Sequence, residues 1–198
     1  MKGRSFDAIV IGTSAGGVDA LSQLLPALPA ELRLSVFIVL HLPRERPSLL
    51  VEIFSDRCAL PVREAEDKEP PAPGTVYFAP PDYHLLVEPG PQLALSIDEP
   101  VNFSRPSIDV LFESAAEIYG PTLLGIILTG ASDDGARGLE AVHLAGGVTV
   151  VQQPQTAQVP LMTESALRRS PVDLVLPLEQ IADLLRTIDG GSSLATNP

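Results

Sequence analysis

Short apolar segments alternate with segments of helical spacing along this chain, and that alternation restricts the fold more than any other feature. The clearest apolar segments are residues 6–11, 34–40 and 122–128, which are rich in Val, Ile and Leu. Such continuous runs are typical of strands buried on both faces, whereas a half-exposed strand alternates apolar and polar residues. Because helical segments separate the strands, the sequence predicts an α/β fold, with a doubly wound, mostly parallel sheet and helices on both faces.

The remaining elements follow from the same spacing rules. Further short strands are expected at residues 75–79, 147–152 and 172–176, and residues 84–87 and 93–96 are expected to form a small antiparallel hairpin at the edge. Helices are expected over residues 18–25, 47–57, 106–119, 134–145, 161–169 and 178–188.

The length and the proline content bear on domain organisation. A chain of 198 residues fits a single domain, which we expect over residues 1–189, followed by a flexible tail at 190–198. Many of the 20 prolines fall between positions 61 and 106. Proline is confined to loops and to the edges of sheets, so this stretch is predicted to consist of loops and short edge strands.

The charge and the cysteine content exclude several classes of protein. The chain carries 25 acidic and 13 basic residues, a formal net charge of −12, whereas a nucleic-acid-binding domain presents a basic surface. The same charge opposes docking on anionic membranes, and no apolar run reaches the roughly 20 residues that span a bilayer. The single cysteine, Cys58, cannot form a disulfide within the chain, which fits the reducing cytoplasm.

Ligands of parallel α/β sheets bind beyond the carboxyl ends of the strands, so the residues that follow each strand are the candidate functional residues. The first strand runs into Gly12-Thr13-Ser14-Ala15-Gly16, which has the G-x-S-x-G spacing of a nucleophile elbow. The competing pattern is the dinucleotide-binding turn G-x-G-x-x-G. Here Ser14 replaces its second glycine, and His41 stands where an acidic residue would bind the ribose, so dinucleotide binding is disfavoured. A third interpretation leaves Ser14 as an ordinary helix cap.

A serine nucleophile needs a base, and the second strand supplies one. That strand ends in His41, and the third strand ends in a segment that contains Asp133 and Asp134. If the three strands are neighbours, the histidine can take the serine proton while one aspartate orients the histidine. The plain structural interpretations are a histidine at a strand end and two acidic helix caps. His84, in the expected hairpin, is the weaker rival base, and His143 lies in mid-helix.

Several segments, in order along the chain, resemble the catalytic domain of the CheB-type chemotaxis protein-glutamate methylesterases. The resemblance runs from about residue 6 to residue 188. It is carried by Ile11-Gly12-Thr13-Ser14-Ala15-Gly16-Gly17, Leu40-His41-Leu42-Pro43, Tyr77-Phe78-Ala79-Pro80 with His84-Leu85, Arg105-Pro106-Ser107-Ile108-Asp109-Val110-Leu111-Phe112, Leu128-Thr129-Gly130 with Asp134-Gly135-Ala136, and Gln153, Thr156-Ala157 and Met162.

The resemblance implies a role for individual residues of this chain. Ser14 corresponds to the family's nucleophile and His41 to its base. Asp134 corresponds to its acid, because the family's aspartate directly precedes a Gly-Ala pair. The resemblance further implies that the backbone N–H groups of Ala15 and Ala131 form the oxyanion hole.

The implied reaction is hydrolysis of glutamyl methyl esters on the cytoplasmic helices of methyl-accepting chemotaxis receptors, with release of methanol. Many family members also deamidate receptor glutamines by the same acyl-enzyme route. Such a serine hydrolase acts in cytoplasmic signal transduction, does not insert into the membrane, and needs no metal and no cofactor. Two alternatives stay open, an esterase or amidase with another substrate and a non-catalytic binding module of the same fold. The sequence does not define the oligomeric state.

Three departures from the family's usual pattern fall in the loops of the expected site. Ala15 stands where the family usually has Thr, Gly130-Ala131-Ser132 where it has Gly-Met-Gly, and Met162-Thr163 where it has Met-Pro. A change of side chain leaves the backbone N–H donors of the oxyanion hole in place. These departures are therefore expected to affect how the substrate fits. The family usually carries an N-terminal receiver domain, for which the start of the first strand at Phe6 leaves no room in this sequence.

Arginines near the strand ends are the candidate substrate-binding residues. Arg44 follows His41, and Arg105 precedes a predicted helix. Together with Arg46 and Arg137, they are expected to form a local basic rim on an otherwise acidic protein. The alternative for each arginine is a solvated surface charge.

Overall fold

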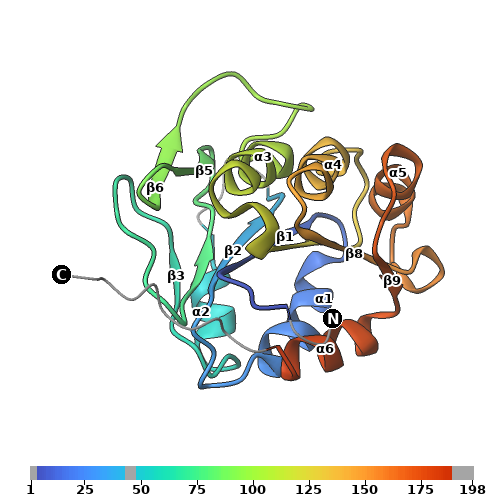
Figure 1. The fold of residues 1–198 in the computed structure, drawn as a ribbon, viewed down its shortest axis with the longest axis horizontal. Helices are drawn as coiled ribbons and strands as arrows, with labels where there is room; N and C mark the ends of the chain where they lie inside the picture. The colour runs from blue at the N-terminus through green and yellow to red at the C-terminus, as the bar shows by residue number, and fades with distance from the viewer. Residues whose placement is uncertain (1–3, 43–47, 189–198) are drawn as a thin grey trace.

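A computed structural model describes residues 4–42 and 48–188 of the chain (Figure 1). Seven parallel strands form one sheet in the order β3-β4-β2-β1-β7-β8-β9. The strands of this sheet are β1 (Ala8–Thr13), β2 (Ser35–Leu40), β3 (Val62–Glu64), β4 (Val76–Phe78), β7 (Leu123–Ile127), β8 (Val148–Gln152) and β9 (Leu174–Leu176). The predicted doubly wound parallel α/β sheet is therefore confirmed.

Helices cover both faces of the sheet. They are α1 (Gly17–Leu24), α2 (Leu50–Ser55), α3 (Ile108–Tyr119), α4 (Ala136–Leu144), α5 (Leu161–Arg169) and α6 (Leu178–Arg186). Buried residues of α1, α2 and α6 share one apolar core with the sheet, and those of α3, α4 and α5 share the other. Figure 1 shows these two sets of helices on opposite sides of the strands. Single turns of 3-10 helix occur at Leu25–Ala27, Gly120–Thr122 and Pro154–Thr156.

The predicted hairpin forms, but as a sheet of its own. Strands β5 (His84–Glu88) and β6 (Gln92–Ser96) pair antiparallel, and their apolar residues pack into the core that α3 shares with the sheet. The Pro-rich stretch also contributes β3, an edge strand of the main sheet. The described helices lack the length and apolarity needed to cross a membrane. The expected tail at 190–198 lies outside the described residues.

Helix α2, expected over residues 47–57, spans only Leu50–Ser55, and two further helices also begin later than the sequence predicts. The helix expected from residue 106 begins at Ile108, and the helix expected from residue 134 begins at Ala136. In the second case, Gly135 has a φ of 97°, a left-handed conformation that non-glycine residues rarely adopt. The preceding Asp134 therefore stays outside its own helix, with its side chain free to bind elsewhere.

The three strand ends singled out in the sequence lie side by side. Strand β1 pairs with β2 on one side and with β7 on the other. The pairing continues past the strands, since the His41 N–H donates to the Thr13 carbonyl at 3.2 Å and the Ser14 N–H donates to the Thr129 carbonyl at 3.0 Å. The side chains that follow β1, β2 and β7 therefore emerge at one edge of the sheet.

Helices α3 and α4 cross at Gly138, where the close contact leaves no room for a larger residue. A Cβ added at Gly138 would lie 2.5 Å from the Phe112 Cβ and 3.0 Å from the Asp109 Cα. These distances are shorter than van der Waals contact, and the second involves backbone that cannot move alone.

We expect Gly138→Ala to lower the free energy of unfolding by about 1–3 kcal/mol, because the added methyl group overpacks this crossing. Urea denaturation measures the change. Leu144→Ala is the matched control, since Leu144 lies on the same helix with 79% of its surface exposed, and it should change stability by less than about 0.5 kcal/mol. Equal stability of the Gly138→Ala variant and the parent chain would contradict the prediction.

Candidate active site

Ser14 follows β1 on a turn that only small residues can make. Gly16 has a φ of 81°, and a Cβ added at Gly17 would lie 2.5 Å from the Leu40 side chain and 2.7 Å from that of Thr13. The two glycines let the chain turn sharply from β1 into α1. Ser14 is left half-buried at the top of this turn, where a nucleophile elbow presents its serine.

The structure brings His41 and Asp134 into direct contact. The Nε2 atom of His41 lies 2.8 Å from Oδ2 of Asp134, and the histidine side chain is 14% exposed while the aspartate is fully buried. Among the described residues, no hydrogen bond joins the Ser14 hydroxyl to the His41 ring. Because Nε2 binds the aspartate, Nδ1 is the ring nitrogen left to accept a proton from a nucleophile.

The Asp134 carboxylate accepts hydrogen bonds from five donors. Besides His41, these are the Ile108 N–H at 2.7 Å, the Ser107 hydroxyl at 2.8 Å, the Asn102 side-chain amide at 3.0 Å and the Asp109 N–H at 3.2 Å. Three of these donors, from residues 107–109, belong to the start of α3, where a negative charge is favoured.

The environment of Asp134 keeps it charged. Burial alone would raise the pKa of this carboxyl group. The hydrogen bonds from His41, the Ile108 N–H and Asn102, together with the attraction of His41, outweigh burial and bring the pKa below its ordinary value. A carboxylate that stays ionised can orient the histidine and stabilise its protonated form.

A second buried carboxylate, Asp109, mirrors the first. It lies in the first turn of α3 and accepts hydrogen bonds from the Gly135 and Gly138 N–H groups at the start of α4, at 2.9 and 2.7 Å. Asp134 precedes α4 and binds the start of α3, so each carboxylate caps the other's helix. The Asn102 amide donates to both carboxylates, at 2.8 Å to Asp109 and 3.0 Å to Asp134.

The pKa of Asp109 moves in the opposite direction to that of Asp134. Burial raises it, and repulsion from the Asp134 carboxylate adds to that effect against the hydrogen bonds of Gly138 and Asn102. The two carboxylates thus have different environments, and the one that binds His41 is the more easily ionised.

The rival bases lie elsewhere. His84 is 1% exposed. Its Nδ1 accepts the Ser107 N–H at 3.2 Å, and its Nε2 donates to the Glu99 carbonyl at 3.2 Å, so it supports the start of α3. His143 lies in the last turn of α4, at the opposite end of that helix from Asp134. Asp133, the other candidate acid, is exposed.

The loop after β7 is anchored through its backbone. The Gly130 N–H donates to the Val159 carbonyl, and the Gly130 carbonyl accepts the Met162 N–H, both at 3.0 Å. A Cβ at Gly130 would lie 2.6 Å from the Met162 Cε and 3.0 Å from the Ser14 Cβ, so this glycine fills the space between the two side chains. Among the described residues, the N–H groups of Ala15 and Ala131 have no hydrogen-bond acceptor, and their role in an oxyanion hole stays a prediction.

The predicted substrate-binding arginines have different surroundings. Arg105 donates to the Asp82 carboxylate at 2.8 and 3.0 Å and to the carbonyls of Ile97 and Asp98 at 2.8 and 3.1 Å, which ties down the loop before α3. Its role in substrate binding stays a prediction. Arg137 is paired with Glu113. Arg44 and Arg46 lie outside the described residues.

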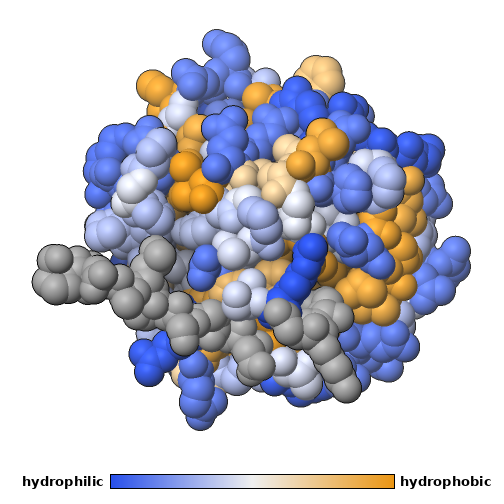
Figure 2. Space-filling model, in the orientation of Figure 1, coloured by the Kyte–Doolittle hydropathy of each residue, from blue (hydrophilic) through white to orange (hydrophobic). Residues whose placement is uncertain are grey.

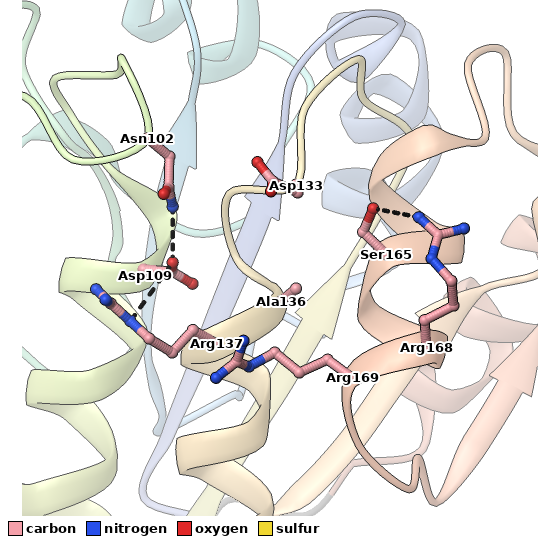
Figure 3. A pocket seen from close by; sticks show the side chains of 8 residues that line it. All are labelled: Asn102, Asp109, Asp133, Ala136, Arg137, Ser165, Arg168 and Arg169. Atoms are coloured by element: carbon pink, nitrogen blue, oxygen red, sulfur yellow. Dashed lines mark hydrogen bonds and ion pairs between the residues drawn. The ribbon is translucent and has the colours of Figure 1, made fainter.

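A polar cleft of about 400 Å³ opens beside the hydrogen-bond network of Asp109 and Asn102 (Figure 3). It is lined by Asn102, Asp109, Asp133, Ala136, Arg137, Ser165, Arg168 and Arg169. Sequence reasoning missed Asn102, Asp109 and the two α5 arginines. Asp109 lies in a segment that carries the resemblance, but at the start of a helix it is indistinguishable from an ordinary acidic cap.

Comparison with known proteins identifies the family. A family model described as CheB methylesterase matches residues 9–185. The chain belongs to the CheB methylesterase family. The resemblance inferred from the sequence is thereby confirmed.

Individual members of the CheB family align over most of the chain. A relative from Leptospira interrogans is 48% identical over 185 residues, which cover 93% of this chain and 96% of the relative. A protein-glutamate methylesterase/protein-glutamine glutaminase from Symbiobacterium thermophilum is 37% identical over 177 residues, 89% of this chain but 49% of that relative, so the chain spans about half its length. The crystal structure of the Thermotoga maritima CheB methylesterase catalytic domain has a TM-score of 0.84 at 33% identity, covering 92% of this chain and 98% of that one.

The lowered pKa of Asp134 predicts a pH-dependent contribution to stability. A carboxyl group with a lowered folded-state pKa stabilises the fold above its unfolded pKa of about 3.9, and this contribution is lost as the pH falls through the folded value. Asp134→Asn should therefore lower the free energy of unfolding by about 3 kcal/mol near neutral pH and by less in acid. Urea denaturation at the two pH values measures the difference.

Asp133→Asn is the control, because Asp133 is exposed and hydrogen bonds of the buried network do not involve it. This variant should have the stability of the parent chain at both pH values. If Asp134→Asn had the same cost in acid as at neutral pH, ionisation of Asp134 would not be what holds the start of α3.

Proposed function

We propose that this protein is a serine hydrolase that removes the methyl group from glutamyl methyl esters on chemotaxis receptors and releases methanol. The observation that carries the proposal is the buried Asp134 carboxylate bonded to His41, on the strand end next to the turn that presents Ser14. The names of CheB relatives, protein-glutamate methylesterase/protein-glutamine glutaminase, support this chemistry and extend it to deamidation of receptor glutamines.

The reaction begins with attack on the ester. The Ser14 Oγ adds to the side-chain carbonyl carbon while Nδ1 of His41 takes its proton. Asp134 holds the ring through Nε2 and stabilises the imidazolium. The N–H groups of Ala15 and Ala131 stabilise the negative oxygen of the tetrahedral intermediate, an effect worth about 10²–10³-fold per donor in comparable enzymes.

The intermediate then collapses. The bond between carbon and the methoxy oxygen breaks, His41 gives its proton to that oxygen, and methanol leaves an acyl group on Ser14. Water attacks the acyl-enzyme as His41 takes one of its protons, and the bond to Ser14 breaks with return of the proton to Oγ. The products are glutamate, methanol and free enzyme. With a glutamine substrate, the leaving group is ammonia.

The receptor partners and the cellular location of the protein follow from this activity. Its partners are the cytoplasmic helices of methyl-accepting receptors, and its location is the cytoplasm, which the single cysteine supports. Residues 1–189 form one catalytic domain, in keeping with a seven-stranded sheet that draws its strands from residues 8 to 176.

Ser14→Ala and His41→Ala should each abolish release of methanol from membranes that carry radiolabelled methylated receptors, because nucleophile and base act as a unit. Asp134→Asn should lower kcat by about 10⁴-fold, as the loss of the orienting acid does in serine proteases. Asp133→Asn should retain activity. If Asp133→Asn were the more damaging of the two, the acid would be wrongly assigned.

Labelling by a fluorophosphonate separates the enzyme from a non-catalytic module. The parent chain should form a covalent adduct at Ser14, and Ser14→Ala should form none. Turnover of short acyl esters without any release of methanol from receptors would instead identify an esterase with another substrate.

Asn102→Ala should lower kcat with little change in KM, because the amide orients Asp134 without reaching the reacting atoms. The expected loss is about 10- to 100-fold, the usual worth of a hydrogen bond to a charged group. Since this bond helps to lower the pKa of Asp134, the loss of stability that accompanies protonation of Asp134 in acid should begin at a higher pH in the variant. A lowered kcat with an unchanged dependence of stability on pH would mean that Asn102 does not act through the charge of Asp134.

A further inference from the structure

Thr129 is a polar residue that lies in the interior of the protein. Hydrophilic residues make up most of the face that Figure 2 shows, whereas Thr129, just beyond the end of β7, is only 1% exposed. A hydroxyl group that is removed from water costs free energy unless it forms hydrogen bonds. The partners of this hydroxyl therefore indicate what Thr129 does.

The Thr129 hydroxyl joins two segments that are far apart in the sequence. The Val159 N–H donates to its Oγ1 at 2.9 Å. Its own proton can go to one acceptor at a time, and the Ala15 carbonyl at 2.9 Å is nearer than the Val159 carbonyl at 3.3 Å. The hydroxyl thus links the turn that presents Ser14 to the segment between β8 and α5.

The backbone of Thr129 holds the same turn from its other side. The Thr129 carbonyl accepts the Ser14 N–H at 3.0 Å, so Thr129 bonds to the chain both before and after the peptide that joins Ser14 to Ala15. The carbonyl of that peptide accepts the Gly17 N–H at 2.8 Å. Because the peptide is planar and trans, the Ala15 N–H points the opposite way, away from the start of α1.

A buried glutamine holds Thr129 in turn. Gln152, the last residue of β8, is 2% exposed. Its side-chain oxygen accepts the Thr129 N–H at 2.9 Å, and its side-chain nitrogen donates to the Thr156 carbonyl at 3.1 Å. The donor and the acceptors of Thr129 are therefore all fixed to the carboxyl ends of neighbouring strands.

We propose that Thr129 is a positioning residue for the reaction, and that it holds the Ser14–Ala15 peptide so that the Ala15 N–H faces the oxygen that becomes negative in the tetrahedral intermediate. This inference rests on the proposed function, in which Ser14 is the nucleophile and the Ala15 N–H is an oxyanion donor. Thr129 does not touch the substrate. It acts by fixing a donor in advance, and such a donor needs no reorganisation as the charge develops.

The proposed role predicts an effect on rate and not on binding. A negative oxygen develops twice, when Ser14 attacks the ester and when water attacks the acyl-enzyme. The Ala15 N–H serves both steps, so its displacement slows both. We therefore expect kcat to fall whichever step limits it, with KM unchanged, because the interaction is made only in the transition states.

Thr149 provides a matched control for a test by substitution. It is also a fully buried threonine, and its hydroxyl likewise donates to one acceptor and accepts one N–H, the Asp173 carboxylate at 2.8 Å and the Asp173 N–H at 3.0 Å. It lies near the amino end of β8, away from the strand ends that form the site. Thr129→Val and Thr149→Val each exchange the hydroxyl for a methyl group of similar shape, and urea denaturation compares their stability.

Thr129→Val should lower kcat on p-nitrophenyl acetate by about 10- to 100-fold at unchanged KM, as expected for a displaced donor, and methanol release from radiolabelled methylated receptor by a similar factor. A fluorophosphonate should label Ser14 more slowly in this variant but to completion, which shows that the protein is folded. Thr149→Val should keep the kcat of the parent chain, even where it loses as much stability as Thr129→Val. Thr129→Ser should keep most of the activity, because it retains the hydroxyl.

Three results would overturn the positioning role. They are the parent kcat in Thr129→Val, an equal loss of kcat in Thr149→Val, and a kcat in Thr129→Ser as low as in Thr129→Val. If Thr129→Val does not fold, Gln152→Met tests the same contacts, because it removes the acceptor of the Thr129 N–H. Its kcat should fall several-fold, and the parent kcat in Gln152→Met would likewise overturn the role.

Failure of the proposed function would look different. A parent chain that hydrolyses p-nitrophenyl acetate but releases no methanol from receptor would refute the proposed substrate, and the variants would still decide the role of Thr129 on the small ester. A parent chain that neither hydrolyses the small ester nor reacts with the fluorophosphonate would refute the nucleophile itself, and the positioning role with it.

Discussion

The exchange of caps between α3 and α4 is the interaction on which the site depends. Asp134 precedes α4 and binds the start of α3, while Asp109 in α3 binds the start of α4. If either helix shifted, its first N–H groups would lose their carboxylate acceptors while they stay buried, which is costly. The position of the Asp134 carboxylate therefore follows from how the two helices are fixed to each other, and His41 binds a carboxylate that other hydrogen bonds already hold in place.

The sequence predicted the part of the site that is local to strand ends. A run of buried strand residues followed by small or polar ones shows where each strand stops, and parallel pairing then places Ser14, His41 and Asp134 at one edge. The glycines at positions 16 and 17 are equally readable, because the turn into α1 permits nothing larger. Each of these residues lies close in sequence to the end of a strand, so its place in the sequence is enough to predict its place in the fold.

The residues that the sequence could not single out act across elements. Asn102 lies in a turn with no catalytic spacing, yet its amide joins carboxylates from two helices. Arg168 and Arg169 face the cleft only because α5 packs beside α4. His84 was a rival base on residue type alone, and its burial under the start of α3 gives it a supporting position. In each case, the deciding fact is a tertiary contact that no pattern in the sequence encodes.

Because the backbone of Gly130 is anchored, the path of this loop is independent of the side chains that the loop carries. Its N–H and carbonyl groups are held by Val159 and Met162, so the path of the loop does not depend on the side chains that follow. Ala131 and Ser132 can therefore vary without moving the backbone of Gly130. A loop held in this way can change its side chains and keep its course. Substitutions at Ala131 and Ser132 should therefore change the surface of this loop while the backbone at Gly130 keeps its place beside Ser14.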